Sequence, residues 1–217
     1  CIRDRCRSLM LDLKRVTLFA IYTSFDKAKT ATQDFQDGEK EKTLDNGLED
    51  TIRALYTCLE SAEFGAVRFI TSKNVIDERG KDLLEDGIVC EEPSIPINNM
   101  KDYARYMIYH LHEHVVTDFV LTIQHDGFIL NPDAWRDDFF DYDYIGAPWP
   151  WREQGFVTPF GEHIAVGNGG FSLRSKKLTE VPTKVDVPFD VVAMNDFYKM
   201  FGGVNWNEDG NLSLIHI

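Results

Sequence analysis

One segment of the chain reads Asp118-Phe-Val-Leu-Thr-Ile123 and passes directly into Gln124-His125-Asp126-Gly127. Its first part is short, nearly all apolar and rich in β-branched and aromatic residues, which is typical of a strand buried on both faces. A second run of this kind, Val16-Thr-Leu-Phe-Ala-Ile-Tyr-Thr23, lies near the start of the chain. We therefore expect two buried strands, one of which ends in a cluster of polar residues.

Segments with helical and strand patterns alternate around these two runs. Short apolar runs at 66–71 and 87–90 predict two more strands. Apolar residues at helical spacing predict two helices. Their stripes consist of Leu48, Ile52, Leu55 and Leu59 and of Tyr103, Met107, Leu111 and Val115. The alternation predicts an α/β fold with a mostly parallel sheet flanked by helices.

Two further segments have a clear pattern. Asn131-Pro132 is typical of a helix start, because Asn is a common cap and Pro suits the first helical position. We expect this third helix to carry Trp135 and Phe139 inward. Residues 26–46 are almost wholly polar, which predicts a solvated loop or insertion.

The composition excludes several classes of protein. The chain has 217 residues, of which 43% are hydrophobic and 27% charged, so it is not disordered, collagen-like or a coiled coil. This length predicts one domain or at most two small ones, with a core that needs no disulfide or metal. Lys and Arg number 23 and Asp and Glu 36, which gives a net charge of −13. Such a surface repels phosphate backbones and anionic lipids, so we expect neither nucleic acid nor membrane as a partner.

The cysteines provide information about localisation, and the two ends of the chain provide information about the domain boundaries. The chain has no Cys-x-x-Cys pair, no apolar run of about 18 residues and no signal-peptide pattern, so we expect reduced thiols and a cytoplasmic protein. There is no initial Met, and residues 212–217 resemble translated sequencing adapter. We therefore expect a fragment with an N-terminal extension at 1–15, a single domain at 16–211 and a non-native tail. A genuine final strand is the alternative for the tail.

Asp126 is the first candidate for a functional residue. In open α/β sheets the ligand lies beyond the carboxyl ends of the strands, and Asp126 comes directly after one of them. A carboxylate on that rigid support suits a hard divalent cation that bridges two phosphates. The alternative is that Asp126-Gly127 is only a turn, which closes a β-hairpin between Ile123 and Phe128.

A second candidate combines aromatic residues with glycines. The stretch 142–151 contains Trp149 and Trp151, whose flat faces suit either sugar stacking or core packing. The stretch 166–175 has three glycines within four residues, which lets the backbone approach a ligand closely and offer N–H donors. A β-bulge or a tight turn is the alternative for this stretch.

Acidic and histidine residues form the remaining clusters. Glu208 and Asp209 follow a Trp and suit a general base with a neighbouring carboxylate, but they also suit a surface turn. His110, His112 and His114 show no third-ligand pattern, so we expect a solvated helix end rather than a metal site.

Four motifs taken together resemble an uncharacterised domain family that is related to GT-A glycosyltransferases. They are Gln124-His-Asp-Gly-Phe128, Tyr142-Asp-Tyr-Ile-Gly-Ala-Pro-Trp149, Gly167-Asn-Gly-Gly-Phe-Ser-Leu-Arg-Ser175 and Asn207-Glu-Asp209. The resemblance runs from about residue 16 to residue 209. It implies a GT-A-like, Rossmann-like fold that is truncated at the C-terminus. It also implies an enzyme that moves a sugar from a nucleotide-diphosphate donor to an acceptor hydroxyl of a carbohydrate.

The resemblance also implies roles for individual residues. Asp126 stands at the second position of a metal-binding Asp-x-Asp and Gln124 at the first, so one carboxylate would hold Mn²⁺ or Mg²⁺, or cationic side chains such as Arg105 would replace the metal. Asp209 would take the proton from the acceptor hydroxyl, with Glu208 as second choice. The substrate-binding set comprises Tyr22, Thr23, Arg105, Gln124, Tyr144, Trp149, Asn168, Gly169 and Gly170.

Two other functions remain open at this stage. A non-catalytic carbohydrate- or nucleotide-binding domain would account for the missing first Asp of the metal motif. A phosphate-handling hydrolase is disfavoured, because neither a second carboxylate cluster nor a nucleophile stands at a strand end.

Overall fold

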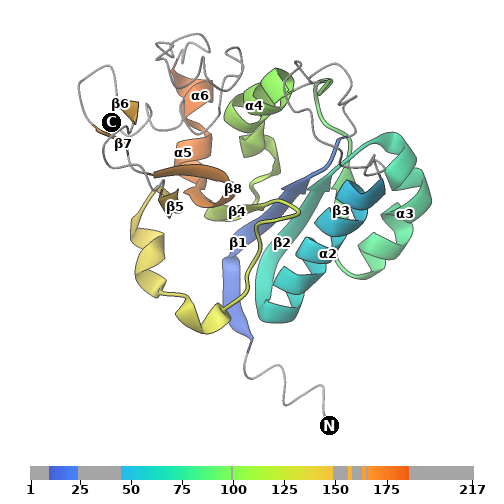
Figure 1. Ribbon diagram of the computed structural model, residues 1–217, viewed down its shortest axis with the longest axis horizontal. Helices are drawn as coiled ribbons and strands as arrows, with labels where there is room; N and C mark the ends of the chain where they lie inside the picture. The colour runs from blue at the N-terminus through green and yellow to red at the C-terminus, as the bar shows by residue number, and fades with distance from the viewer. Residues whose placement is uncertain are drawn as a thin grey trace, which may run out of the picture.

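The computed structural model describes residues 10–23, 45–98, 100–148, 156–157, 163–164 and 166–185. A six-stranded sheet forms their centre, with helices on both faces, which confirms the α/β fold expected from the sequence (Figure 1). The strands of this sheet are β1 (Leu11–Ile21), β2 (Ala62–Ile70), β3 (Val89–Glu91), β4 (Phe119–Ile123), β5 (Tyr144–Pro148) and β8 (Val166–Ser175). A separate antiparallel pair consists of β6 (Phe156–Val157) and β7 (His163–Ile164).

The order of the strands indicates where in the sheet a ligand site is expected. Across the sheet they run β3-β2-β1-β4-β8-β5. β1 is parallel to both β2 and β4, whereas β8 is antiparallel to β4 and β5. The chain order therefore changes direction between β1 and β4. At such a switch point the loops beyond the carboxyl ends of the strands separate and leave a crevice for a ligand.

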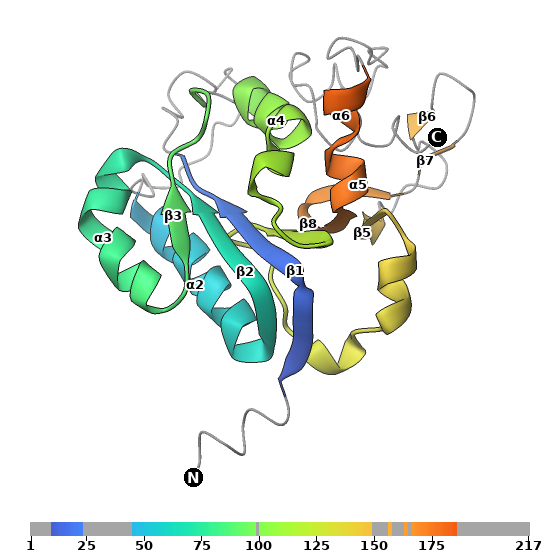
Figure 2. The ribbon, with the colours of Figure 1, turned by 180° about the vertical axis from the view of Figure 1, so that it is seen from behind.

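Helical segments cover the two faces of the sheet. They are α2 (Asp45–Ser61), α3 (Lys73–Glu85), α4 (Met100–Tyr109), η3 (Leu111–His114), η4 (Pro132–Ala134), η5 (Asp137–Asp141), α5 (Lys176–Thr179) and α6 (Val181–Lys184). One core cluster joins the sheet to α2, α3 and the segment after β4. A second cluster joins the opposite face to α4 and η3, which lie in front of the sheet in Figure 2.

Buried apolar residues account for the elements that the sequence pattern predicted. All five residues of β4 are buried, and α2 directs Ile52 and Leu55 into the core as its stripe indicated. β1 begins at Leu11 rather than Val16, so residues 11–15 continue the predicted strand toward the N-terminus. β2 likewise begins four residues before the predicted start, at Ala62.

Helix α3 was not predicted from the sequence. It is mostly charged, and only Val75 and Leu83 are buried along its length. The connection itself was the available signal, because parallel strands need a crossover of a dozen or more residues, usually a helix. Gly87 follows this helix with a φ of 85°, a left-handed conformation that a glycine adopts without strain.

The segment after β4 differs from the predicted third helix. Asn131 precedes a 3₁₀ turn, its side chain makes no capping hydrogen bond, and a second 3₁₀ turn, η5, follows. Trp135 and Phe139 nevertheless pack against the core, with their rings 5.3 Å apart. The inward direction of these aromatic residues was predicted correctly, and the type of helix was not.

Several expectations fall wholly or largely outside the described residues. They concern the polar segment 26–46, the tail at 212–217 and the domain end at 211, which stay predictions. The membrane expectation can be compared with the structure: within the described residues, no helix combines the length and the apolar character that a bilayer crossing requires.

Candidate functional site

The carboxyl ends of β1 and β4 lie side by side. Ala20 pairs with Ile123 in the parallel register, so the residues that follow each strand emerge next to one another. The backbone N–H of Tyr22 donates to the carbonyl of Ile70 at 2.9 Å, which extends the sheet beyond the end of β1. The hydroxyl of Thr23 is buried and makes no hydrogen bond within the part of the chain that the structure describes. A buried polar atom without a partner is costly, and this hydroxyl lacks a partner that the described residues could supply.

Asp126 stands in a tight turn at the end of β4. The N–H of Gln124 donates to the carbonyl of Gly127 at 3.2 Å, and the N–H of Gly127 donates back at 3.1 Å. A tight turn is therefore present, with His125 and Asp126 at its centre. It differs from the alternative kept at the sequence level, because an isolated bridge closes it and Phe128 does not begin a second strand. The turn directs its acidic side chain outward: the carboxylate of Asp126 is 71% exposed and lies 4.0 Å from His125 Nδ1.

This turn packs directly against the glycine-rich strand. A Cβ on Gly127 would lie 3.0 Å from the Cβ of Phe171 and 3.3 Å from the carbonyl oxygen of Gly170. The two motifs are 43 residues apart in the chain, counted from residue 127 to residue 170, yet they touch at the carboxyl edge of the sheet. The structure therefore brings Asp126 together with the glycine segment.

The glycine segment is a strand rather than a loop. The carbonyl oxygen of Gly169 accepts hydrogen bonds from Thr122 Oγ1 at 2.9 Å and from the buried Arg174 Nη2 at 3.3 Å. The register of its pairing with β5 shifts on either side of Ala147, which agrees with the irregular pairing that a β-bulge produces. These hydrogen bonds hold the backbone of Gly169 in one position beside the turn.

Helix α4 approaches the same edge from the other face of the sheet. Gln124 Nε2 donates to the hydroxyl of Tyr103 at 3.0 Å, which ties the end of β4 to this helix. Arg105, two residues further along, is exposed and forms no ion pair with any described residue. Its guanidinium is therefore available to an anion, although no contact in the structure joins it to Asp126.

Not every predicted site residue lies at this edge. Tyr144 pairs with Arg174 toward the amino end of β4, and its ring is 8% exposed with that guanidinium 5.7 Å from its centre. We therefore leave Tyr144 out of the candidate site. Asn168 is described only through its backbone pairing with Ala147. Trp149, Glu208 and Asp209 lie outside the described residues.

The family that is described as "Protein of unknown function (DUF5672)" matches residues 89–210. The chain belongs to this family. The matched range of this DUF5672 chain begins at the first residue of β3 and contains the Asp126 turn, the glycine segment and the pair Glu208–Asp209. It does not reach β1 or β2, so it is shorter than the resemblance inferred from the motifs. Membership of an uncharacterised family is thus confirmed, while the relation to GT-A glycosyltransferases stays a prediction.

Other comparisons add little to the family match. Among curated proteins, no match to the DUF5672 chain was found. Among solved structures, 4-diphosphocytidyl-2C-methyl-D-erythritol synthase from Anaerococcus prevotii DSM 20548 is similar, with a TM-score of 0.42 and 12% sequence identity. The similarity covers 88% of this chain and 85% of that one. Likeness at this level carries no inference about activity.

A buried polar network beside β3 was missed at the sequence level. His114 Nδ1 lies 2.8 Å from Glu91 Oε2, and His114 Nε2 lies 2.7 Å from the hydroxyl of Tyr106. Burial lowers the pKa of His114, and the hydrogen bond to Glu91 opposes this effect. A neutral ring with its proton on Nδ1 donates a hydrogen bond to the carboxylate of Glu91, and its Nε2 accepts a hydrogen bond from the hydroxyl of Tyr106. His114 is therefore a satisfied buried histidine and not part of a solvated helix end.

The same network contains a charged partner. Arg68 Nη1 donates to the other oxygen of Glu91 at 3.1 Å, so both carboxylate oxygens of this β3 residue are used. The signal in the sequence was the position of His114 beside Leu111 and Val115, on the apolar face of a helical stripe.

The residues of the DUF5672 chain fit a cation only in combination with a phosphate. Within the described ranges, no three His, Cys, Asp or Glu side chains gather closely enough to hold a metal ion. Mg²⁺ in proteins is commonly held by one or two carboxylates, with substrate phosphates and water as its other ligands. The exposed carboxylate of Asp126 is suited to that role, but alone it is too little to retain a metal.

Proposed function

We propose that the chain binds a nucleotide-diphosphate sugar between the carboxyl ends of β1 and β4 and transfers the sugar to an acceptor hydroxyl. The packing of the Asp126 turn on Gly170 carries this proposal, because it unites two motifs at the switch point of the sheet. Ligands of open α/β sheets bind at that point. The resemblance of the motifs to GT-A glycosyltransferases supports the same function.

Residues at the end of β1 line the nucleotide in this proposal. The buried hydroxyl of Thr23 gains a hydrogen-bond partner from the ligand, and Tyr22 lies beside it. The backbone of Gly169 and Gly170 lets the sugar lie close to β8, with Asn168 and Trp149 as further contacts.

Two positive charges neutralise the diphosphate in this proposal: a cation held by Asp126 and the guanidinium of Arg105. Asp126 would hold Mn²⁺ or Mg²⁺, and the cation would neutralise the charge that develops on the leaving diphosphate. Arg105 is exposed on α4 and provides a second positive charge, or the only one if no metal takes part.

Asp209 acts as the base in the proposed reaction, and Glu208 is the second choice. A hydroxyl is a poor nucleophile, and a positioned base contributes roughly 10²–10⁴-fold to the rate. The carboxylate removes the proton of the acceptor hydroxyl, and the hydroxyl oxygen forms the new bond to the sugar. The bond between the sugar and the diphosphate breaks, and the nucleoside diphosphate leaves with the bonding electron pair.

Thermal unfolding with UDP- and GDP-sugars, with and without Mn²⁺, tests the proposal. A ligand at a hundred times its Kd stabilises the chain by about 2.7 kcal/mol. We expect stabilisation by one nucleotide sugar with Mn²⁺, and no stabilisation by Mn²⁺ alone, because Asp126 is a lone carboxylate. Asp126→Ala should remove the metal-dependent part, whereas Asp133→Ala, which removes another exposed aspartate, should keep it.

Two outcomes contradict different parts of the proposal. If no nucleotide sugar stabilises the chain, the proposed function is wrong. If Asp126→Ala behaves like Asp133→Ala, the role of Asp126 is wrong, although the nucleotide site stands. Donor turnover by Asp209→Asn at the parent's rate would remove Asp209 from the mechanism.

A non-catalytic binding domain is the second candidate. It is favoured by Gln124, which occupies the first metal position with an uncharged amide that is hydrogen-bonded to Tyr103. This function predicts binding of a sugar or nucleotide that is indifferent to Mn²⁺ and is followed by no donor turnover.

A further inference from the structure

The regular pairing of β8 is interrupted where this strand reaches the candidate site. Its pairing with β4 ends at Ser172, opposite Thr122, and on the β5 side its register passes directly from Ser172 to Asn168. Gly169 therefore belongs to a segment whose backbone neither ladder fixes. The next residue, Gly170, is the one whose carbonyl oxygen meets the turn at the end of β4. Irregular pairing of this kind is over-represented next to active sites.

Buried side chains hold this segment in place of the ladders. The carbonyl oxygen of Gly169 accepts hydrogen bonds from Thr122 Oγ1 at 2.9 Å and from Arg174 Nη2 at 3.3 Å. Arg174 Nε also donates to Ser172 Oγ at 3.0 Å, and that oxygen lies 2.9 Å from Thr122 Oγ1. None of the three residues is more than 2% exposed. We call Thr122, Ser172 and Arg174 the Gly169 clamp.

The guanidinium sets the direction of the hydrogen bonds in the Gly169 clamp. A guanidinium donates and never accepts, so Ser172 Oγ accepts from Arg174. In the shortest contacts that remain, the hydroxyl of Ser172 donates to Thr122 Oγ1, and the hydroxyl of Thr122 donates to Gly169. The ring of Tyr144 lies 5.7 Å from the guanidinium carbon and supports it from the side of β5. The hydrogen bonds of the clamp thus lead to one carbonyl oxygen.

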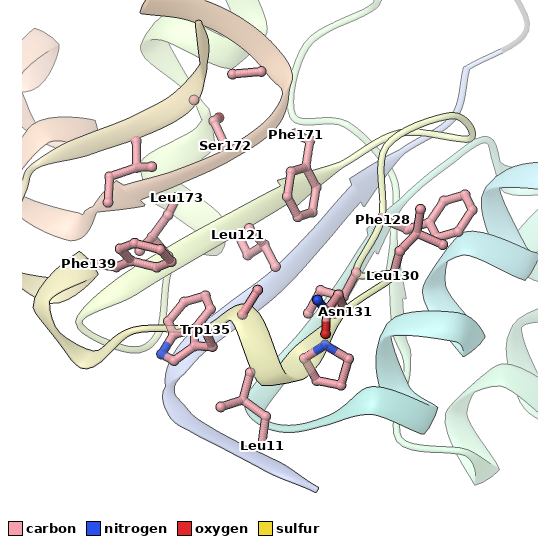
Figure 3. Close-up of a pocket in the computed structure, with 16 residues that line it drawn as sticks. Leu11, Leu121, Phe128, Leu130, Asn131, Trp135, Phe139, Phe171, Ser172 and Leu173 are labelled. Carbon is pink, nitrogen blue, oxygen red and sulfur yellow. The ribbon is translucent and has the colours of Figure 1, made fainter.

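The clamp and the apolar side chains of β8 lie on opposite faces of the sheet. Side chains alternate along a strand, so Ser172 and Arg174 lie on one face and Phe171 and Leu173 on the other. Figure 3 shows Phe171 and Leu173 in an apolar pocket on the side of the segment that follows β4. The Cβ of Phe171 would lie 3.0 Å from a Cβ on Gly127. The strand is therefore fixed by polar contacts on one face and packs against the turn beside them.

We propose that Thr122, Ser172 and Arg174 are positioning residues of the candidate site. By holding the carbonyl of Gly169, they fix the segment against which the Asp126 turn packs. Their effect on the donor rests on the proposed function, in which the sugar lies against this segment. If the clamp opens, the turn loses its support, and the carboxylate of Asp126 moves away from the position in which it would hold a cation beside the diphosphate.

Removal of one hydroxyl from the clamp tests the proposal. Thr122→Val keeps the shape of the side chain and removes its hydroxyl, whereas Thr122→Ser keeps the hydroxyl. Thr17→Val is the matched control, because Thr17 is a fully buried threonine of β1 whose hydroxyl lies 2.8 Å from that of Thr117. Thermal unfolding shows how much stability each variant loses.

The amide signals of two glycines report on the turn by NMR spectroscopy of the chain labelled at its glycine nitrogens. We expect Thr122→Val to shift the signal of Gly127, which lies in the turn, and to leave that of Gly87, which precedes β3, unchanged. Thr122→Ser should restore the signal of the parent. Thr17→Val should shift neither signal, although it also removes a buried hydroxyl.

Donor binding measures the consequence for function. With Mn²⁺ and the UDP- or GDP-sugar that stabilises the parent, Thr122→Val should raise the Kd about fivefold, as expected for one lost hydrogen bond. Thr122→Ser and Thr17→Val should keep the Kd of the parent. Arg174→Lys retains the charge but loses the planar fork that reaches two acceptors, so it should raise the Kd at least as much. Thr122→Val decides the matter if Arg174→Lys does not fold.

The outcomes separate this proposal from the proposed function. An unchanged Gly127 signal in Thr122→Val overturns the positioning role, whether or not the chain binds a nucleotide sugar. A shifted signal together with an unchanged Kd overturns the effect of the clamp on the donor. If no nucleotide sugar stabilises the parent, the proposed function is wrong, and the Gly127 signal alone decides whether the clamp positions the turn.

Discussion

Two glycines are required for different reasons. Gly87 has a φ of 85° and open space around its Cα, so only its backbone conformation demands a glycine. Gly127 has no positive φ, but a side chain there would collide with Phe171 and Gly170. The glycine of the Asp-Gly motif therefore serves the contact between two motifs and not the shape of the turn.

Alanine substitutions separate these two requirements. Gly127→Ala should cost about 1–3 kcal/mol of unfolding free energy through overpacking, and should also weaken binding of the nucleotide sugar, because the Asp126 turn must move. Gly87→Ala should cost about 1–2 kcal/mol through backbone strain alone and leave ligand binding unchanged. Chemical denaturation and ligand titration measure both effects. Equal effects of the two variants on ligand binding would argue against the contact as a determinant of the site.

At the scale of elements, the buried network fixes helices to the edge of the sheet. His114 from η3 links Glu91 at the end of β3 with Tyr106 of α4. Because burial lowers the pKa of His114, the folded chain holds this ring neutral at a pH where the unfolded chain binds a proton.

This network predicts a loss of stability in acid. The pKa of the histidine in the unfolded chain is about 6.5, so its contribution is fully present above that pH. It is lost as the pH falls from there toward the lower pKa of the folded state. We expect the unfolding free energy of His114→Gln to depend less on pH between 7.5 and 5.5 (about one unit on either side of the usual histidine pKa) than that of the parent. His125→Gln, at an exposed histidine, shows whether removing any histidine has this effect. An unchanged pH dependence in His114→Gln would contradict the assignment.

Across the whole molecule, one thiol reports on the integrity of the core. Cys58 of α2 is 0% exposed, and the N–H of Ile129 donates to its Sγ at 3.4 Å. Burial raises the pKa of this thiol to about 11. The reactive form of a cysteine is the thiolate, so both access and ionisation protect Cys58 in the folded chain.

Alkylation by iodoacetamide should therefore follow global unfolding at this position. We expect Cys58 to be modified only as the chain unfolds in denaturant, and Cys90, which is half-buried, to be modified earlier. Mass spectrometry of the peptides that contain each cysteine measures the two rates. Modification of Cys58 at the rate of Cys90 in the absence of denaturant would show that the core between α2 and the segment after β4 opens locally.

The local sequence pattern was sufficient to predict a helix or strand where that element buries a clear apolar surface of its own. The apolar runs of β1 and β4 and the stripe of α2 were recognisable because each must bury its own surface, and their alternation was enough for the α/β class. Helix α3 was not recognisable from its stripe, because it buries only Val75 and Leu83. The segment after β4 was assigned the wrong helix type, because the cap signal at Asn131 does not distinguish an α-helix from a 3₁₀ turn.

The candidate site depended on contacts between distant parts of the chain. No periodicity indicates that Gly127 rests on Gly170 or that Tyr144 lies away from the Asp126 turn. The sequence indicates which side chains are apolar enough to be buried and which carry charge, since these are properties of each residue and its neighbours. Which of them meet is decided by the order and direction of the strands, and these follow from the packing of the whole sheet.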